Sequence, residues 1–342
     1  MSKHLKLLGA ALVLALSAGT LMAGDYHTDS SLICSDCHTM HYSISHTYTG
    51  GPTTPLTGGP YVGLLKADAN TMCLQCHDGQ TFAPDVIGLN TGTNVREAGA
   101  LTTGVAPYED WKGHTLGVPN VVAPGGTFNT GTTGLECLNC HVQHGQSHAT
   151  YPAGYTNKQY RNLQSKPGTA PTDIALAYAI GTNDTTLPIF ERDATLGQVG
   201  IHYSVNNVDF NEPDTTKSAF GEWCQGCHTV FHGAANEGTA KNWFRHPTAG
   251  IKIGTPGAAY FSSLTQFTGH TNRVKVMNPT GNWDAGQTDF TPSCFSCHKS
   301  HGNQNAFGLI YMKGTGVVTE EGDDGTQAKN LCRQCHIQGT DA

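Results

Sequence analysis

The sequence predicts a mostly irregular, coil-rich single domain with short helices and few small strands, held together by covalent cross-links more than by an apolar core. Three observations predict this class. Only 37% of the 342 residues are hydrophobic and 13% are charged, which leaves too few apolar residues for a usual core and too few charges for ordinary disorder. Glycine is abundant, with 42 copies, and Gly-Gly-Pro at 50–52 and 58–60 interrupts any periodic segment. Twelve cysteines are available as cross-links.

The first 23 residues have the parts of a secretory signal peptide. Two lysines precede an apolar run from Leu7 to Leu16, and small residues follow, with cleavage expected after Ala23 or Gly24. The apolar run is shorter than the roughly 20 residues that span a bilayer, so we expect no transmembrane segment. A net charge of −7 offers no basic surface for nucleic acid. We therefore expect a signal peptide over 1–23 and one exported domain over 24–342.

Every cysteine belongs to a CxxCH motif, and none is left over. Two thiols three positions apart on one helical turn can bind the vinyl groups along one edge of a haem, and the next residue then presents its imidazole to the iron. Zinc ribbons and thioredoxin-like sites also use CxxC, but neither requires a His after each pair. The sequence therefore predicts six covalent haems c, on Cys34 and Cys37, Cys73 and Cys76, Cys137 and Cys140, Cys224 and Cys227, Cys294 and Cys297, and Cys332 and Cys335, with proximal ligands His38, His77, His141, His228, His298 and His336.

Six haems in a chain of this length decide the fold class. The porphyrins themselves form much of the core, and the thioether bonds staple a chain that buries too little apolar surface alone. We therefore expect a haem-stapled multihaem c-type cytochrome with one domain.

The histidine count favours an imidazole as the sixth ligand of each iron. Eleven histidines lie outside the motifs and the signal peptide, against four methionines. Bis-histidine ligation gives low-spin iron at low potential, because methionine ligation would raise the potential. This pattern favours an electron carrier with no catalytic residues over an enzyme.

Three histidines follow a proximal ligand by three residues, at the odd haems only. They are His41, His144 and His301. Residues at i and i+3 share one side of a turn, so such a histidine cannot reach the opposite face of its own haem. If each serves the preceding odd haem, His301 binds haem 3 and His144 binds haem 1. His41 then has no earlier haem to bind, and haem 5 has no later histidine of this type. The simplest solution is that His41 binds haem 5 of a neighbouring subunit in a head-to-tail homopolymer.

A second spacing pattern concerns the even haems. His114 and His270 each follow a glycine and precede the first cysteine of the next motif by 23 or 24 residues, so we expect them at haems 2 and 4. For haem 6 we expect His246, because Pro247 stiffens its segment. Two alternatives for haem 6 stay open, His232 and His27. The remaining histidines are expected at the surface or near propionates: His46, His148 and His202.

The motifs resemble a known family. The stretches C-S-D-C-H-T-M-H, W-K-G-H around His114, G-E-W-C-Q-G-C-H-T with R-H-P between Gly221 and Pro247, and N-L-C-R-Q-C-H run through the whole mature chain. They are similar to those of OmcS-like outer-surface hexahaem cytochromes, whose subunits polymerise into extracellular nanowires. The resemblance implies bis-His ligation, a mostly coil fold, continuous haem stacking and donation of His41 to haem 5 of the adjacent subunit.

The predicted function is long-range electron transfer in a secreted, extracellular or outer-surface filament. Partners would be further copies of the chain, other cytochromes or extracellular electron acceptors. Two alternatives remain open. One is a monomeric periplasmic electron shuttle with the same haems. The other is a multihaem reductase, which would need a five-coordinate haem with an open distal pocket.

Overall fold

The computed structural model describes a set of ranges that includes all six CxxCH motifs. These ranges are 27, 34–38, 61, 64–90, 98–143, 163–174, 219–229, 252–254, 262–270, 274, 276, 290–316, 322–323 and 325–337. The helical elements in them are α2 (Cys34–Cys37), α3 (Ala69–His77), η3 (Asp110–Lys112), η4 (Cys137–Asn139), α4 (Ala219–Gln225), α5 (Leu264–Gly269), η8 (Cys294–Ser296), η9 (Ala306–Gly308) and α6 (Lys329–Cys332).

Coil dominates the described ranges, which confirms the predicted fold class. The elements are short, and the β structure in these ranges consists of isolated bridges, such as His38 with Leu65 and His298 with Leu309. A few small strands were expected from the sequence, and in the described ranges isolated bridges are found instead.

Each CxxCH motif begins on a helical turn. In four motifs the N–H of the histidine donates to the carbonyl of the first cysteine at 2.9 Å, as His141 does to Cys137. Local caps fix where these turns start. Ser293 caps η8 by accepting from the N–H of Phe295 at 3.1 Å, and its own N–H donates to Ser296 Oγ at 2.9 Å. The turn places the two sulfurs and the imidazole of one motif on one local surface.

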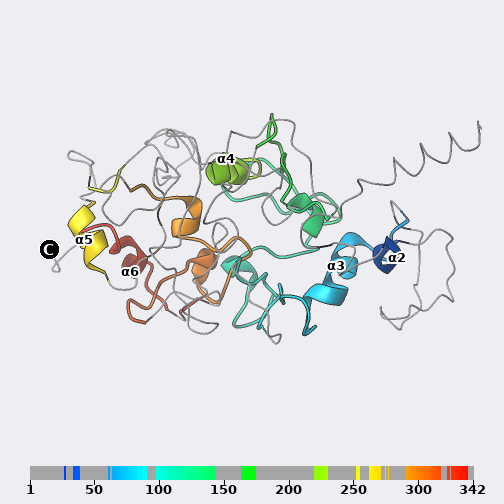
Figure 1. Ribbon diagram of the computed structural model, residues 1–342, viewed down its shortest axis with the longest axis horizontal. Coiled ribbons are helices and arrows are strands. Elements are labelled where there is room, and N and C mark those ends of the chain that lie inside the picture. Colours follow the sequence, from blue (N-terminus) through cyan, green and yellow to red (C-terminus); the bar gives the residue numbers. More distant parts are fainter. Residues whose placement is uncertain are drawn as a thin grey trace, which may run out of the picture.

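The motif elements extend along the longest axis of the molecule. Figure 1 shows α2 and α3 near one end, α4 between, and α5 with α6 near the opposite end. The first and sixth motifs, on α2 and α6, therefore lie at opposite poles.

One apolar cluster in the described ranges lies at the last two motifs. Eight buried side chains pack there, and Cys297 and Cys335 pack against the same cluster. The eight are Ile253, Phe267, Val274, Val276, Phe290, Ile310, Tyr311 and Leu331. At about 25 cal/mol per Å² of buried apolar surface, so few side chains provide a small fraction of what a chain of this length needs.

Three glycines lie where three segments of the chain cross. Gly302 bridges both Gly99 and Gly113. Around this crossing the N–H of His114 donates to the His301 carbonyl at 2.9 Å, and the N–H of Ala100 donates to the Gly302 carbonyl at 2.7 Å. Gly302 has a φ of +121°, a conformation that favours glycine, and a Cβ there would lie 2.6 Å from the Gly113 Cα. The crossing brings two predicted ligands, His114 and His301, side by side.

Candidate haem sites

The structure describes the side chains of eleven motif cysteines, all except Cys34, and none of these eleven forms a disulfide. Burial raises the pKa of Cys140, Cys297 and Cys335 to about 12 and that of Cys227 to about 11. Zinc sites and thioredoxin-like sites use the thiolate, which a raised pKa disfavours. The thiols of Cys140, Cys227, Cys297 and Cys335 are therefore protonated at neutral pH.

Five histidines share one ring orientation. The Nδ1 atom of each lies 2.7–3.4 Å from a main-chain carbonyl oxygen. Because a carbonyl can only accept, Nδ1 carries the hydrogen and Nε2 keeps its lone pair for a metal. The five pairs are His27 with Gln143, His77 with Pro84, His114 with Ser300, His228 with Pro124, and His298 with Phe307.

Three pairs of imidazoles face each other at one repeated separation. The ring centroids are 6.1 Å apart for His27 and His77, 6.2 Å for His114 and His228, and 6.2 Å for His141 and His301. A metal–imidazole bond is about 2 Å, so two rings that bind one iron from opposite sides have centres about 6 Å apart. Each pair joins one proximal histidine to one histidine outside the motifs.

This donor set fits haem c. One turn carries two thiols and an imidazole, and a second imidazole faces the first at the separation that one iron requires. Burial, followed by the neighbouring His228, lowers the pKa of His114 to about 4, so the ring is neutral at pH 7 and able to bind a metal.

The first four motifs are neighbours in the order of the sequence. Burial, and after it the nearby Cys73 thiol, raise the pKa of Cys37, which places motifs 1 and 2 together. The Cys73 thiol donates a hydrogen bond to the Cys137 sulfur, which raises the pKa of Cys73 and lowers that of Cys137, so motifs 2 and 3 are in contact. Burial and the neighbouring Cys227 raise the pKa of Cys140, which joins motifs 3 and 4.

The last three motifs continue the series. Phe220 of α4 and Phe295 of η8 have ring centroids 5.0 Å apart in an edge-to-face contact, so motifs 4 and 5 pack together. Cys297 and Cys335 pack on one apolar cluster, which joins motifs 5 and 6. The six motifs thus form one continuous line between the two poles of Figure 1.

The structure brings some predicted ligands to the expected motif and others to a different one. Sequence spacing assigned His301 to haem 3, and its ring lies 6.2 Å from that of His141. Spacing assigned His114 to haem 2, whereas its ring lies 6.2 Å from His228 of motif 4. His270, expected at haem 4, lies at motif 6, where its Nε2 is 3.2 Å from the Arg333 carbonyl.

These differences have a physical cause. The number of residues between a histidine and the next cysteine does not determine which motif the histidine contacts in the fold. Gly113 pairs with Gly302, which follows motif 5, so His114 lies beside motif 5 and the neighbouring motif 4. Sequence reasoning also placed His27 only among the alternatives for haem 6, whereas its ring faces His77 of motif 2. The only sequence signal for His27 was that it precedes the first motif.

Several predicted positions lie outside the described residues. They include the signal peptide at 1–23 and the candidate distal ligands His41, His144, His246 and His232, as well as His46, His148 and His202. Their assignments stay predictions.

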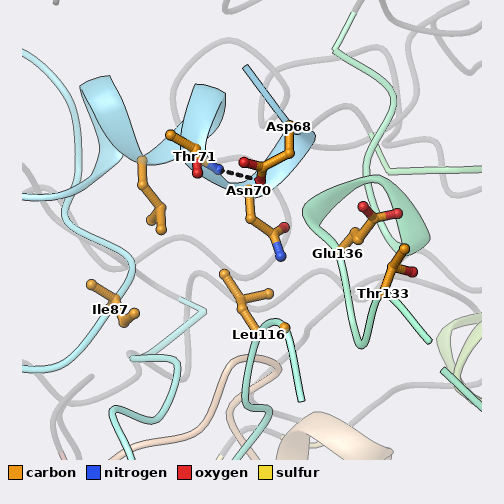
Figure 2. Close-up of a pocket in the computed structure, with 9 residues that line it drawn as sticks. Asp68, Asn70, Thr71, Ile87, Leu116, Thr133 and Glu136 are labelled. Carbon is orange, nitrogen blue, oxygen red and sulfur yellow. Dashed lines mark hydrogen bonds between the residues drawn. The ribbon is translucent and has the colours of Figure 1, made fainter. Parts of the chain in front are cut away.

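A cavity of about 440 Å³ lies between α3 and the η4 turn. Figure 2 shows Asn70 pointing from α3 towards the segment that carries Glu136. Two carboxylates line the cavity, and no motif cysteine or histidine does, so its donors do not fit a haem. The lining residues are Asp68, Asn70, Thr71, Leu74, Ile87, Leu116, Gly117, Thr133 and Glu136.

Asn70 ties the second motif to the third beside this cavity. Its Nδ2 donates to the Leu135 carbonyl at 3.0 Å, and its Oδ1 accepts from the N–H of Cys137 at 2.8 Å. We expect Asn70→Ala to lower the free energy of unfolding by about 1–3 kcal/mol, because both partners lose a hydrogen bond. Guanidinium unfolding followed by haem absorbance measures this. Gln80→Ala, an exposed amide after the same helix, is the control. An equal midpoint for both variants would contradict the role of Asn70.

Among the described residues, none of the helices is both long and apolar enough for a membrane crossing.

Comparison with known proteins identifies similar chains. A model of the doubled CXXCH motif matches residues 290–340, the segment that contains motifs 5 and 6. The C-type cytochrome OmcS of Geobacter sulfurreducens is 26% identical over 375 aligned residues, which cover 88% of this chain and 84% of OmcS. These findings confirm the resemblance to OmcS-like c-type cytochromes that the motifs predicted.

Two solved structures are also similar. The Outer Membrane Cytochrome S filament of Geobacter sulfurreducens has a TM-score of 0.44 at 21% identity, covering 81% of this chain and 83% of its own. The OmcS nanowires of the same organism, solved by cryo-EM, have a TM-score of 0.38 at 17% identity, covering 89% and 93%.

Proposed function

We propose that the chain is an OmcS-like multihaem c-type cytochrome that transfers electrons over a long range through six covalent haems c. The observation that carries this proposal is the line of motifs. Each motif is next to the following one, and the line ends at opposite poles of the molecule. An electron path of this kind needs closely spaced redox groups and no catalytic step.

The haem iron supplies the redox chemistry, and the chain positions it and sets its potential. The two cysteines of each motif anchor the group, and the following histidine offers Nε2 to the iron. Main-chain carbonyls hold Nδ1–H of five histidines, as Ser300 does for His114 at 2.7 Å. Such a bond makes the imidazole a stronger donor, which stabilises the oxidised iron and lowers its potential. Bis-histidine ligation acts in the same direction.

We also propose that subunits join head to tail into a secreted filament. The ring of His301 lies next to His141 of motif 3. This agrees with the rule from spacing that a histidine three residues after a proximal ligand binds the iron of another haem. By the same rule His144 serves haem 1, and His41 serves haem 5 of a neighbouring subunit. Motifs 1 and 6 lie at opposite poles, so such a contact would extend the line of haems from one copy to the next.

The remaining assignments complete this proposal. Residues 1–23 direct export and are removed, and residues 24–342 form one hexahaem domain. The filament would lie outside the cell or at its outer surface, where other cytochromes or extracellular acceptors exchange electrons with it. The alternatives are a monomeric periplasmic shuttle and a multihaem reductase.

One set of measurements on the purified mature protein tests the proposal. Intact mass is expected to show six haems, and absorption and electron paramagnetic resonance spectra are expected to show low-spin iron throughout. Electron microscopy is expected to show fibres whose iron ligands can be traced. A monodisperse monomer with fully low-spin haems would favour the shuttle, and a high-spin centre in the assembled protein would favour the reductase.

A further inference from the structure

His27 has no place in the scheme derived from spacing, yet its position is specific. Its ring centroid is 6.1 Å from that of His77, the proximal histidine of motif 2. Its Nδ1 lies 3.4 Å from the Gln143 carbonyl, and the Nδ1 of His77 lies 3.1 Å from the Pro84 carbonyl. Both rings are therefore oriented with Nε2 available for a metal.

A second pair in the chain has the same arrangement. His114 faces His228 of motif 4 at 6.2 Å, and its Nδ1 lies 2.7 Å from the Ser300 carbonyl. Ser300 is the second residue after the proximal histidine of motif 5, and Gln143 is the second residue after that of motif 3. In both cases a histidine faces an even motif while the turn of the next odd motif holds its Nδ1.

We propose that His27 is the distal ligand of the haem at motif 2, and that the turn after motif 3 holds it in place. This inference rests on the proposed function, since it requires a haem at that motif. It removes His27 from the alternatives for haem 6, for which His246 was expected. His114 has the equivalent role at motif 4.

The arrangement couples neighbouring haems through the main chain. The Gln143 carbonyl orients the ligand of haem 2, while Gln143 itself follows the proximal ligand of haem 3, His141. The thiols of Cys73 and Cys137 form a second contact between the same two motifs. Haem 2 therefore acquires its sixth ligand from a segment that precedes motif 1, held by a turn that belongs to motif 3.

The test compares three variants of the full-length exported holoprotein: His27→Ala, His27→Met and the control His202→Ala, which alters a histidine left without a haem. Intact mass first verifies processing and the number of haems. In His27→Ala we expect about one sixth of the iron to become high-spin in the ferric electron paramagnetic resonance spectrum. Added imidazole is expected to restore the low-spin signal.

The methionine variant keeps an iron ligand at position 27. It therefore allows the test to be made even if the alanine variant is not produced in folded form. In His27→Met we expect all haems to stay low-spin and one of the six to titrate at a raised potential, because a thioether favours the reduced iron. The control is expected to match the wild type in both readouts. A merely structural role would not produce a methionine-specific change in potential.

The outcomes separate this inference from the proposed function. If the wild type carries six low-spin haems and both His27 variants have its spectra and potentials, His27 is not a ligand and the proposed function stands. If the wild type lacks haem at motif 2, both the inference and the haem count are wrong.

Discussion

Replacing Gly302 with alanine is expected to disturb two haem centres at once. The new Cβ would lie 2.6 Å from the Gly113 Cα, 2.8 Å from the Lys112 carbonyl oxygen and 2.9 Å from the Ala100 carbonyl oxygen, on a backbone with a φ of +121°. All three contacts are with main chain, which cannot rotate away. The cost should be about 3 kcal/mol or more, from the strained φ together with the clash.

Relief of this clash must separate the segments that carry His114 and His301. These segments are joined by the hydrogen bond from the N–H of His114 to the His301 carbonyl at 2.9 Å. We therefore expect partial loss of distal ligation at motifs 3 and 4 together, measured as high-spin iron approaching one third of the total. A single histidine substitution should affect only one centre.

Gly316→Ala is the matched control for Gly302→Ala. Gly316 has a φ of +86°, and nothing lies within 4 Å of a Cβ placed there. Its substitution should therefore cost only the backbone strain, roughly 1 kcal/mol, without any change in spin state. If both variants gave the same wild-type spectrum, the crossing would not be what positions the two ligands.

The second large effect is expected for His41→Ala. This variant should keep six haems but lose fibre assembly, and one haem should become high-spin because haem 5 loses its ligand from the neighbouring copy. Electron microscopy, light scattering and electron paramagnetic resonance measure these changes. A variant that still assembled with six low-spin haems would overturn the head-to-tail ligation. His148→Ala, which alters a histidine without an assigned haem, is the control.

Mixing gives a sharper test of the same prediction. A His41→Ala subunit can still accept His41 from a wild-type copy at its own haem 5, but it donates no ligand. Small amounts added during assembly should therefore terminate growth, and fibre length should fall as the fraction of variant rises. Unchanged fibre lengths would show that subunits join without His41.

The motifs could be predicted from the sequence because their chemistry is local. Two thiols and an imidazole on one turn need only five residues, so Cys137, Cys140 and His141 identify a haem without any knowledge of the fold. The coil-rich class followed from composition for the same reason. Local geometry also showed that His301 cannot reach the far face of its own haem. Its assignment to motif 3 needed the further assumption that each such histidine serves the preceding odd haem.

The pairing of His114 and His27 with their motifs depends on distant contacts. His114 reaches motif 4 because Gly113 bridges Gly302, nearly 190 residues away along the chain. His27 meets the Gln143 carbonyl across 116 residues. Neither contact involves a side-chain pattern that could be read along the sequence, because one needs the absence of a Cβ and the other uses a main-chain oxygen.

The carbonyl partners of Nδ1 have a consequence for how this chain can change over time. Each of the five partners belongs to the backbone, so point mutation of Gln143, Pro84, Ser300, Pro124 or Phe307 alters a side chain and leaves the acceptor oxygen in place. The surrounding loops can therefore accumulate substitutions while the donor strength of the imidazoles is preserved. Most substitutions in these coil segments are therefore expected to leave the haem reduction potentials almost unchanged.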